Sequence, residues 1–361
     1  MSKVRETYEI RQFRQGDADR FATLYEAVFE ATPPDEWFDW KYRDNPFVDH
    51  VPITVAVDGD GTLVGARPLL ALPMAAGSRK FLALQPGDTM VHPDHRRQGL
   101  FTRMTERTIE RYHDHEAALF FNFPNEKSGP GYRKLGWRDV GEVTTYYRIQ
   151  SPGAWLDAGS IPDAAADLIA DGYNRVRDAL ATAPDDVAVE RYEEIPAELV
   201  ASQYRSRIPD GFHANRSVRY LRWRFRNPEW TYRTYVARDA CERPIGAAVV
   251  GTQIDGGRTI AKLTDVVPPT AGRRELAALL SAALSDHDGA DTIAAPACLP
   301  RDVLSQVGFH PDTAPTLSLA STTMNHVARP ATVDADDWTL FGRSVTDADN
   351  WALTFGEQDT S

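Results

Sequence analysis

The chain has 361 residues, of which 42% are hydrophobic and 25% charged, and its formal net charge is −12. This composition is typical of a folded protein with about two domains, and the acidic balance argues against a nucleic-acid partner, which favours a basic surface. The longest uncharged apolar stretch, residues 68–76, is too short for the ~20 residues of a membrane span, and two cysteines cannot build a disulfide framework or a cysteine-rich zinc site.

The charge has an unusual make-up. Six lysines stand against 34 arginines and 52 acidic residues, a bias that resembles proteins from salt-loving microbes, whose acidic surfaces stay hydrated in concentrated salt. A site for cationic substrates is the alternative, but the acidic residues are spread along the whole chain. The opening sequence MSKVRETYEI lacks the apolar region of a secretory signal, so we expect a cytoplasmic protein.

The first half of the chain predicts strands and helices in alternation. Residues 8–13 alternate like a strand, and a Gly-Asp pair begins a helix over 16–29. After the block WKYRDNP at 40–46, residues 53–72 predict a β-hairpin around a Gly-Asp-Gly turn. A strand that runs into a helix, a further strand and a short helix that ends at a Gly-Trp step follow.

The second half repeats these blocks in the same order. WRFRNP at 223–228 echoes WKYRDNP, and a second strand–turn–strand pattern follows it. LTDVVPPTAGRRELAALL then echoes GDTMVHPDHRRQGLFTRM, and Gly308-Phe309 echoes Gly136-Trp137. Four matched blocks in one order indicate a duplication.

The repeat sets the expected domain boundaries. The first copy covers residues 1–150, a connection 151–184, the second copy 185–328 and an acidic tail 329–361. Apolar residues at helical spacing predict a connecting helix over 161–181. We expect the aromatic residues of the tail to anchor it onto the body of the protein: Trp338, Phe341 and Trp351.

The segment MVHPDHRRQGLF, residues 90–101, joins a strand that ends at Val91 to a helix that begins near Gly99. The amides of a first helical turn have no partners within the helix and lie at the positive end of its dipole, so a diphosphate fits there. Gly99 lets a ligand approach the backbone, and Arg96 and Arg97 add charge-assisted contacts.

This loop resembles the pyrophosphate signature Arg/Gln-x-x-Gly-x-Gly/Ala of the GNAT superfamily of acetyl-CoA-dependent N-acetyltransferases, with Phe101 in place of the last small residue. The order of strands and helices is also that of this superfamily. The resemblance implies an α/β fold with two tandem GNAT-like domains, each a mixed, mostly antiparallel sheet of α+β type flanked by helices. It also implies acetyl-CoA as the co-substrate, no metal, and direct transfer to a primary amine of a small-molecule or peptide acceptor.

The resemblance also assigns the cofactor site. In this superfamily the strand before the loop splays from its neighbour and pairs with the pantetheine arm. The second copy has Val267-Pro268-Pro269 at this place and no Arg-x-x-Gly after it, and because prolines lack amide donors we expect it to have lost cofactor binding. The expected cofactor-binding residues are Thr89, Met90, Val91, Arg96, Arg97, Gln98, Gly99, Leu100, Phe101, Thr102 and Asn125.

Amide formation needs a base for the amine and an acid for the leaving thiolate, because an amine of pKa ~10.4 is rarely neutral near pH 7. Tyr132, in GYRKLGW, matches the superfamily's Tyr-x-x-x-Gly-aromatic segment, and its protonated phenol is the expected acid. The corresponding position of the second copy lies near Leu304, which cannot donate. The base stays open among Asp88, Glu126, the C-terminal carboxylate of Ser361 and a chain of waters, and Asp88 is the residue we assign.

Other signals carry less weight. The pairs His92/His95 and His113/His115 have no carboxylate or thiol partners at ligand spacing, so no metal site is expected. The basic and aromatic stretch 216–233 is similar to single-strand binders, but its likeness to 40–46 favours a structural helix and turn. Two other functions stay open: transfer from another acyl-CoA, and a non-catalytic acyl-CoA sensor whose copies form a homo-oligomer.

Overall fold

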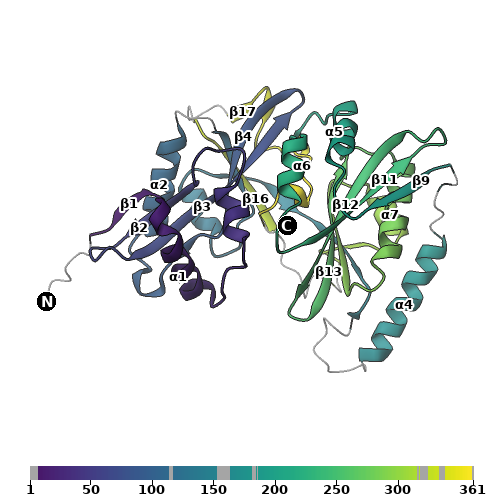
Figure 1. The fold of residues 1–361 in the computed structure, drawn as a ribbon, viewed down its shortest axis with the longest axis horizontal. Coiled ribbons are helices and arrows are strands. Elements are labelled where there is room, and N and C mark those ends of the chain that lie inside the picture. The colour runs from purple at the N-terminus through teal and green to yellow at the C-terminus, as the bar shows by residue number, and fades with distance from the viewer. Residues whose placement is uncertain are drawn as a thin grey trace. The chain divides into compact units, whose positions relative to one another are not determined.

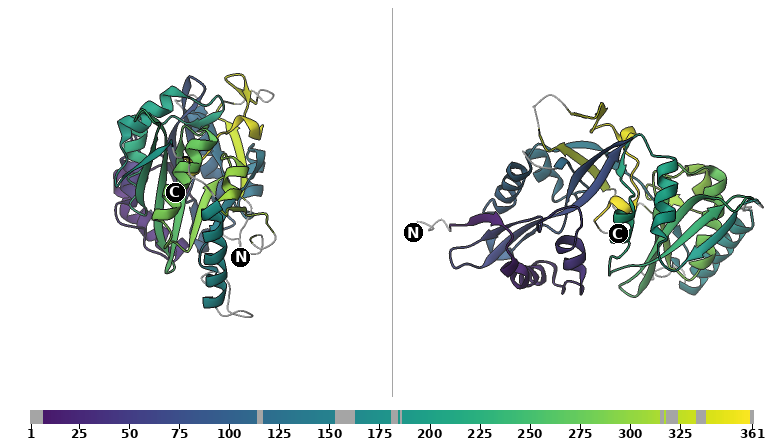
Figure 2. Two further views of the ribbon diagram at one scale, coloured as in Figure 1. Left: turned by 90° about the vertical axis from the view of Figure 1, so that its right-hand side faces the viewer. Right: turned by 45° about the horizontal axis from the view of Figure 1, so that its top comes forward.

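The computed structural model describes residues 7–113, 117–152, 163–180, 184, 186–314, 317, 324–332 and 338–359. The chain forms two compact units, each with its own sheet (Figures 1 and 2). The first unit contains residues 1–75, 79–141 and 325–350, and the second contains 76–78, 142–324 and 351–361.

The sheet of the first unit has the strand order β1-β2-β3-β4-β6-β16-β7, with β5 paired to β3. β4 and β6 run parallel, whereas β1 with β2, β2 with β3 and β6 with β16 are antiparallel. Helix α1 packs beside β5, and α2 packs across β1 and β2 (Figure 1). The elements are β1 (Glu9–Gln12), η1 (Gln15–Asp17), α1 (Ala18–Phe29), η2 (Asp39–Arg43), β2 (Ile53–Val57), β3 (Leu63–Ala76), β4 (Arg79–Pro86), β5 (Met90–Val91), η3 (Pro93–His95), α2 (Leu100–His113), β6 (Ala117–Asn122), α3 (Gly129–Lys134), β7 (Arg138–Val143), β16 (Met324–Pro330), β17 (Thr339–Leu340), β18 (Arg343–Ser344) and η5 (Ala348–Asn350).

The sheet of the second unit has the strand order β15-β8-β14-β13-β12-β11-β9. β13 and β14 run parallel and the other neighbours antiparallel. Helices α5 and α7 pack against it. The elements are β8 (Thr145–Ile149), α4 (Asp163–Leu180), β9 (Ala188–Tyr192), α5 (Ala197–Ser206), β10 (Phe212–Ala214), α6 (Val218–Arg224), β11 (Thr231–Arg238), β12 (Pro244–Asp255), β13 (Arg258–Val267), α7 (Arg273–Asp286), β14 (Thr292–Pro296), α8 (Arg301–Gln306), β15 (His310–Pro311) and η6 (Phe355–Glu357).

The two sheets repeat one topology, as the sequence blocks predict. β1-β2-β3-β4-β6 of the first corresponds to β9-β11-β12-β13-β14 of the second, and the parallel pair occurs at the same place in both. The match extends to single hydrogen bonds: the Trp137 amide donates to the Tyr132 carbonyl at 3.1 Å, and the Phe309 amide donates to the Leu304 carbonyl at 3.0 Å. The glycines before these aromatic residues both have a positive φ, 88° and 81°. The fold is therefore a mixed α/β architecture in two tandem units.

Each sheet also contains a strand from a distant part of the chain. β8, at the end of the first copy, lies between β14 and β15 of the second sheet, and β16, which spans the end of the second copy, lies between β6 and β7 of the first. The yellow-green β16 is visible beside the blue strands in Figure 2. Each exchanged strand supplies hydrogen-bond partners to backbone groups on both of its sides. Each unit therefore includes residues from beyond the range expected for its copy.

The predicted helices have the expected roles, and the tail is anchored in part: Phe341 is 41% exposed, with its ring 5.4 Å from that of Phe81, and the Trp351 ring lies 4.9 Å from that of Phe212. α2 buries Leu100, Met104, Thr108 and Tyr112 at helical spacing, and η2 and α6 bury the aromatic residues of the two repeated blocks, as the structural interpretation of 216–233 predicts. In the tail, Trp338 is buried and has Arg138 over its ring at 4.1 Å. Within the described residues, no helix has the length and apolarity that crossing a membrane requires.

One buried histidine of the first unit makes its stability depend on pH. His326, on β16, packs against the rings of Phe121 and Phe123, and burial lowers its pKa to about 3. Since an unfolded histidine titrates near pH 6.5, acid between about pH 6.5 and pH 3 protonates the unfolded chain and not the folded one, and stability falls.

We therefore expect His326→Phe to lose part of this acid sensitivity. Between pH 7 and pH 5, the wild type should lose about 2 kcal/mol more unfolding free energy than the variant. Urea unfolding followed by near-UV circular dichroism at both pH values measures this difference. Equal losses in the two proteins would contradict a neutral buried His326.

Candidate active site

Strand β5 offers backbone groups on the side away from its partner. Gly65 faces Val91 and Ala66 faces Met90, and the His92 amide donates to the Val64 carbonyl at 2.9 Å. Hydrogen-bonded and non-hydrogen-bonded pairs alternate along antiparallel strands. Met90 and His92 therefore direct their backbone groups towards β3, whereas those of Val91 point the other way, where Arg96 Nε donates to the Val91 carbonyl at 3.3 Å. β4 pairs with β6 through residues 82–84. β5 comes after β4 in the chain and pairs with β3 instead.

The loop after β5 turns its amides towards one place. After the turn η3, Arg97 and Gly99 have φ values of 63° and 74°, and the Arg103 amide makes the first α-helical bond, to the Gly99 carbonyl at 3.0 Å. Left-handed residues in such a loop form a concave nest of N–H groups that binds anions. A Cβ atom on Gly99 would meet nothing within 4 Å, so open space lies directly beside the backbone.

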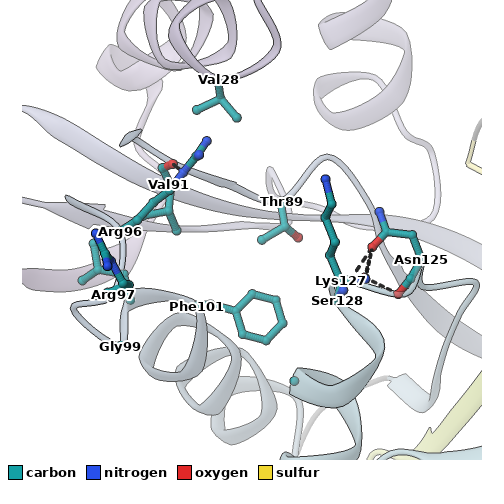
Figure 3. A pocket seen from close by; sticks show the side chains of 12 residues that line it. Val28, Thr89, Val91, Arg96, Arg97, Gly99, Phe101, Asn125, Lys127 and Ser128 are labelled. Atoms are coloured by element: carbon teal, nitrogen blue, oxygen red, sulfur yellow. Dashed lines mark hydrogen bonds between the residues drawn. The ribbon is translucent and has the colours of Figure 1, made fainter. Parts of the chain in front are cut away.

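A cavity of about 560 Å³ connects this loop to β5. In Figure 3, Arg96, Arg97 and Gly99 lie at one end, Asn125, Lys127 and Ser128 at the other, and the Phe101 ring lies between them. The lining residues are Val28, Thr89, Val91, Arg96, Arg97, Gly99, Leu100, Phe101, Asn125, Lys127, Ser128 and Gly131.

Most residues expected to bind the cofactor line this cavity, and three do not. Met90 is fully buried and directs its backbone to β3. The side chains of Gln98 and Thr102 are exposed to solvent, although the Thr102 amide belongs to the first turn of α2. Eight of the eleven expected residues thus line one cavity, and their binding of a cofactor stays a prediction.

Phe101 fits the site because Gly131 has no side chain. A Cβ atom on Gly131 would lie 2.9 Å from Phe101 Cε1, so the ring packs directly on the backbone of α3. The bulky residue at the last position of the loop signature is thus matched by a small one across the cavity.

Tyr132, the expected acid, follows the lining residue Gly131 on α3 but does not itself line the cavity. It is 3% exposed, and its ring makes edge contacts with Phe101 and Trp137. Asn122 Nδ2 donates to the Tyr132 hydroxyl at 2.6 Å. Because the phenol oxygen accepts this bond, its own O–H stays available to donate to another group. Asn122, which ends β6, was not predicted from the sequence.

Asp88, the expected base, lies two residues before β5 and does not line the cavity. Lys41 Nζ lies 2.6 Å and the Tyr42 hydroxyl 2.5 Å from Asp88 Oδ2. Lys41 is 2% exposed, so the ion pair compensates a buried cation. Glu126 is exposed beside the cavity, and Ser361 lies outside the described residues.

Asn125 has a structural role beside its place in the lining. Its side-chain oxygen accepts bonds from the amides of Lys127 and Ser128 at 3.1 and 3.0 Å, visible as dashed lines in Figure 3. This turn sets the start of α3 and with it the position of Tyr132. In the described part of the chain, no three His, Cys, Asp or Glu side chains gather as a metal site would require.

The second unit has a different arrangement at the corresponding place. A Glu275 carboxylate oxygen lies against Gly272, the residue that caps α7. A carboxylate at a helix N-terminus interacts with the dipole and amides that would otherwise attract a phosphate. The prolines 268 and 269 supply no amide donors.

Comparisons with known proteins bear on the first unit and on the fold. Residues 9–140 match the family model described as acetyltransferase (GNAT) domain. A solved GCN5-related N-acetyltransferase from Anabaena variabilis ATCC 29413 is 11% identical over 90% of this chain and 73% of its own, with a TM-score of 0.60. A probable N-acyltransferase from Enterococcus faecalis V583 is 12% identical with the same coverage and a TM-score of 0.61.

A GCN5-related N-acetyltransferase from Kribbella flavida is 17% identical over 91% of this chain and 72% of its own, with a TM-score of 0.58. At such identities these structures show a shared fold, while the family model covers the unit that holds the cavity. None of the curated proteins matches the chain. Residues 9–140 therefore carry the match to a GNAT acetyltransferase domain, and the chain shares its fold with solved GCN5-related N-acetyltransferases.

Proposed function

We propose that the first unit binds acetyl-CoA and transfers its acetyl group to a primary amine of a small-molecule or peptide acceptor. One observation carries this proposal: a single cavity is lined both by a loop with two left-handed residues, Arg97 and Gly99, and by Val91 of β5, whose backbone groups point away from β3. A long ligand with a diphosphate at one end and an amide-containing arm fits such a cavity.

The loop residues hold the diphosphate. The amides from Arg97 to Thr102 donate to its oxygens, and the Arg96 and Arg97 guanidinium groups, which are exposed at the cavity mouth, add charge. Val91 pairs with the amides of the pantetheine arm as an added strand does, and Thr89 binds near the thioester.

Tyr132 serves as the acid. The amine nitrogen forms a bond to the thioester carbonyl carbon, the carbon–sulfur bond breaks, and the Tyr132 hydroxyl gives its proton to the sulfur. Asn122 holds the phenol oxygen and stabilises the charge left on it. Asp88 serves as the base: its two bonds from Lys41 and Tyr42 both end on Oδ2, so Oδ1 is the atom that takes the amine's proton.

We also propose that the second unit has lost cofactor binding, since Glu275 and two prolines stand where the loop amides would be needed. A cytoplasmic location, adaptation to high salt and a homo-oligomeric state stay predictions from the sequence.

The proposal is tested by supplying acetyl-CoA with a panel of primary amines (amino sugars, polyamines, amino acids and peptides) and measuring free thiol together with acetylated product by mass spectrometry. An amine that gives both signals at equal rates supports N-acetyl transfer. Thiol release from another acyl-CoA but not from acetyl-CoA would assign a different donor, and binding without turnover across the panel would favour the sensor.

The Gly99 position allows a specific test of cofactor binding. Gly99→Ala puts a methyl group into the space beside the loop, and we expect coenzyme A to bind at least about tenfold more weakly, or ~1.4 kcal/mol. Gly61→Ala is the matched control, because Gly61 has a similar φ of 82° and equally open surroundings in the β2–β3 turn. Both variants bear the same backbone strain of about 1–2 kcal/mol. Equal affinity of the two variants for coenzyme A, measured by calorimetry, would contradict the assigned phosphate loop.

A further inference from the structure

Arg67, on β3, is a buried cation beside the proposed reaction centre. Arg67 is 1% exposed, and its Nη1 donates to Thr89 Oγ1 at 2.7 Å. The guanidinium carbon lies 4.9 Å from the ring centroids of both Phe101 and Tyr132. Arg67 therefore contacts the proposed acid and two residues that line the cavity.

Two donors of this guanidinium, Nε and Nη2, are buried without a hydrogen-bond partner among the described residues. The other deeply buried arginines have strong acceptors: Arg216 binds Asp265 and Glu357, Arg148 binds Asp178, and Arg224 binds two backbone carbonyls. No carboxylate of the described residues pairs with Arg67. A buried charge without an opposite charge is costly, and the two aromatic rings compensate only part of that cost.

The unpartnered atoms form one edge of the guanidinium group. Nε–H and Nη2–H point in the same direction and match the two oxygens of a carboxylate. Arg216 uses this same edge in the second unit, where Nε donates to Asp265 Oδ2 at 2.8 Å and Nη2 to Oδ1 at 2.7 Å. Arg67 thus presents the same edge of its guanidinium group that in Arg216 binds the Asp265 carboxylate.

We propose that Arg67 recognises a carboxylate carried by one of the two reactants of the proposed transfer reaction. The diphosphate is not this anion, because the loop binds it at the opposite end of the cavity, whereas Arg67 contacts Thr89 and Tyr132. The carboxylate belongs either to the acyl chain of the donor, as in malonyl-CoA or succinyl-CoA, or to an acceptor that is an amino acid. The Phe101 ring separates the guanidinium from the cavity, so it moves aside when the carboxylate binds.

The first arm of the test concerns the donor. Calorimetric titrations compare malonyl-CoA with butyryl-CoA, and succinyl-CoA with valeryl-CoA, on the wild type, Arg67→Met and Arg67→Lys. If the donor carries the carboxylate, the wild type binds the charged member of a pair at least tenfold more tightly. Arg67→Met abolishes that preference, and Arg67→Lys, which keeps the charge but not the paired donors, retains part of it.

The second arm concerns the acceptor. Thiol release from acetyl-CoA is measured with amino acids and with the amines that lack the α-carboxylate, such as lysine against cadaverine and tyrosine against tyramine. If the acceptor carries the carboxylate, KM is at least tenfold lower for the amino acid in the wild type and equal for both in Arg67→Met. A carboxylate preference that Arg67→Met removes, in either arm, supports the proposal and identifies its source.

Thermal unfolding separates recognition from a structural role. Arg67→Met leaves no buried acid unpaired, so its melting temperature should equal or exceed that of the wild type, and a large drop would assign Arg67 to the fold instead. The binding of coenzyme A itself separates this proposal from the proposed function. If coenzyme A binds but neither arm shows a preference that depends on Arg67, the carboxylate site is refuted and the acyltransferase site stands; if coenzyme A does not bind, both fall.

Discussion

Replacing Tyr132 with phenylalanine is expected to lower kcat by about 10²–10⁴-fold, the usual contribution of a general acid. The variant removes one oxygen from a side chain that is 3% exposed and keeps the ring contacts with Phe101 and Trp137. The thiolate then leaves without a proton donor, and Asn122 loses its acceptor. Affinity for coenzyme A should change little, because the phosphate loop and the outward edge of β5 are untouched. Single-turnover thiol release together with calorimetry measures the two effects separately.

Tyr112→Phe is the matched control. Tyr112 is also a buried tyrosine of the first unit, near the C-terminal end of α2 and outside the cavity lining, and its hydroxyl lies 2.7 Å from His50 Nε2. This variant should keep the turnover of the wild type. A Tyr132→Phe protein with undiminished kcat would refute the acid, and an equal loss in both variants would point to a general effect of removing a buried hydroxyl.

Replacing Arg216 with methionine is expected to destabilise the second unit by about 3–5 kcal/mol, the cost of leaving buried charges without their partner. Arg216, Asp265 and Glu357 are all fully buried. Burial raises the pKa of the Asp265 carboxyl, and the adjacent guanidinium opposes this shift. Without Arg216, two carboxyl groups would remain in the interior, and the segment from Trp351 to Asp359 would lose a main attachment to its unit.

Arg243→Met serves as the comparison. Arg243 pairs with Asp239 in an exposed turn of the same unit, and exposed pairs contribute little to stability. Urea unfolding should place this variant within about 0.5 kcal/mol of the wild type. If Arg216→Met were equally stable, the buried cluster would not hold the C-terminal segment.

The repeated topology, and the strand–loop–helix geometry of the loop proposed to bind phosphate, could be predicted because both are local in the sequence. The repeated blocks recur in one order, and the loop signature lies within a dozen residues between a strand and a helix. The same local reasoning identified Tyr132 through its distance from the Gly136-Trp137 step. The repeated blocks, the loop and the segment around Tyr132 each depend on the backbone geometry of residues that are close together in the sequence.

The rest depends on contacts between residues far apart in the chain. β8 and β16 each pair with a strand far from them in the chain, so nothing local predicts which sheet they join. Arg67 interrupts an apolar strand, which is the one signal that could have singled it out, but its contacts with Thr89 and Tyr132 appear only when the sheet and α3 come together. The partners of Asp88 were hidden for the same reason, since Lys41 lies 47 positions away.

The central claim is that the loop from Arg96 to Thr102 binds the diphosphate of a coenzyme A ester. Calorimetric titration of the wild type with coenzyme A, and with pantetheine, which has no diphosphate, tests it most directly. We predict saturable binding of one coenzyme A per chain, and binding of pantetheine that is weaker by at least about two powers of ten, or ~2.7 kcal/mol. No heat signal with millimolar coenzyme A, or equal affinity for pantetheine, would contradict the account.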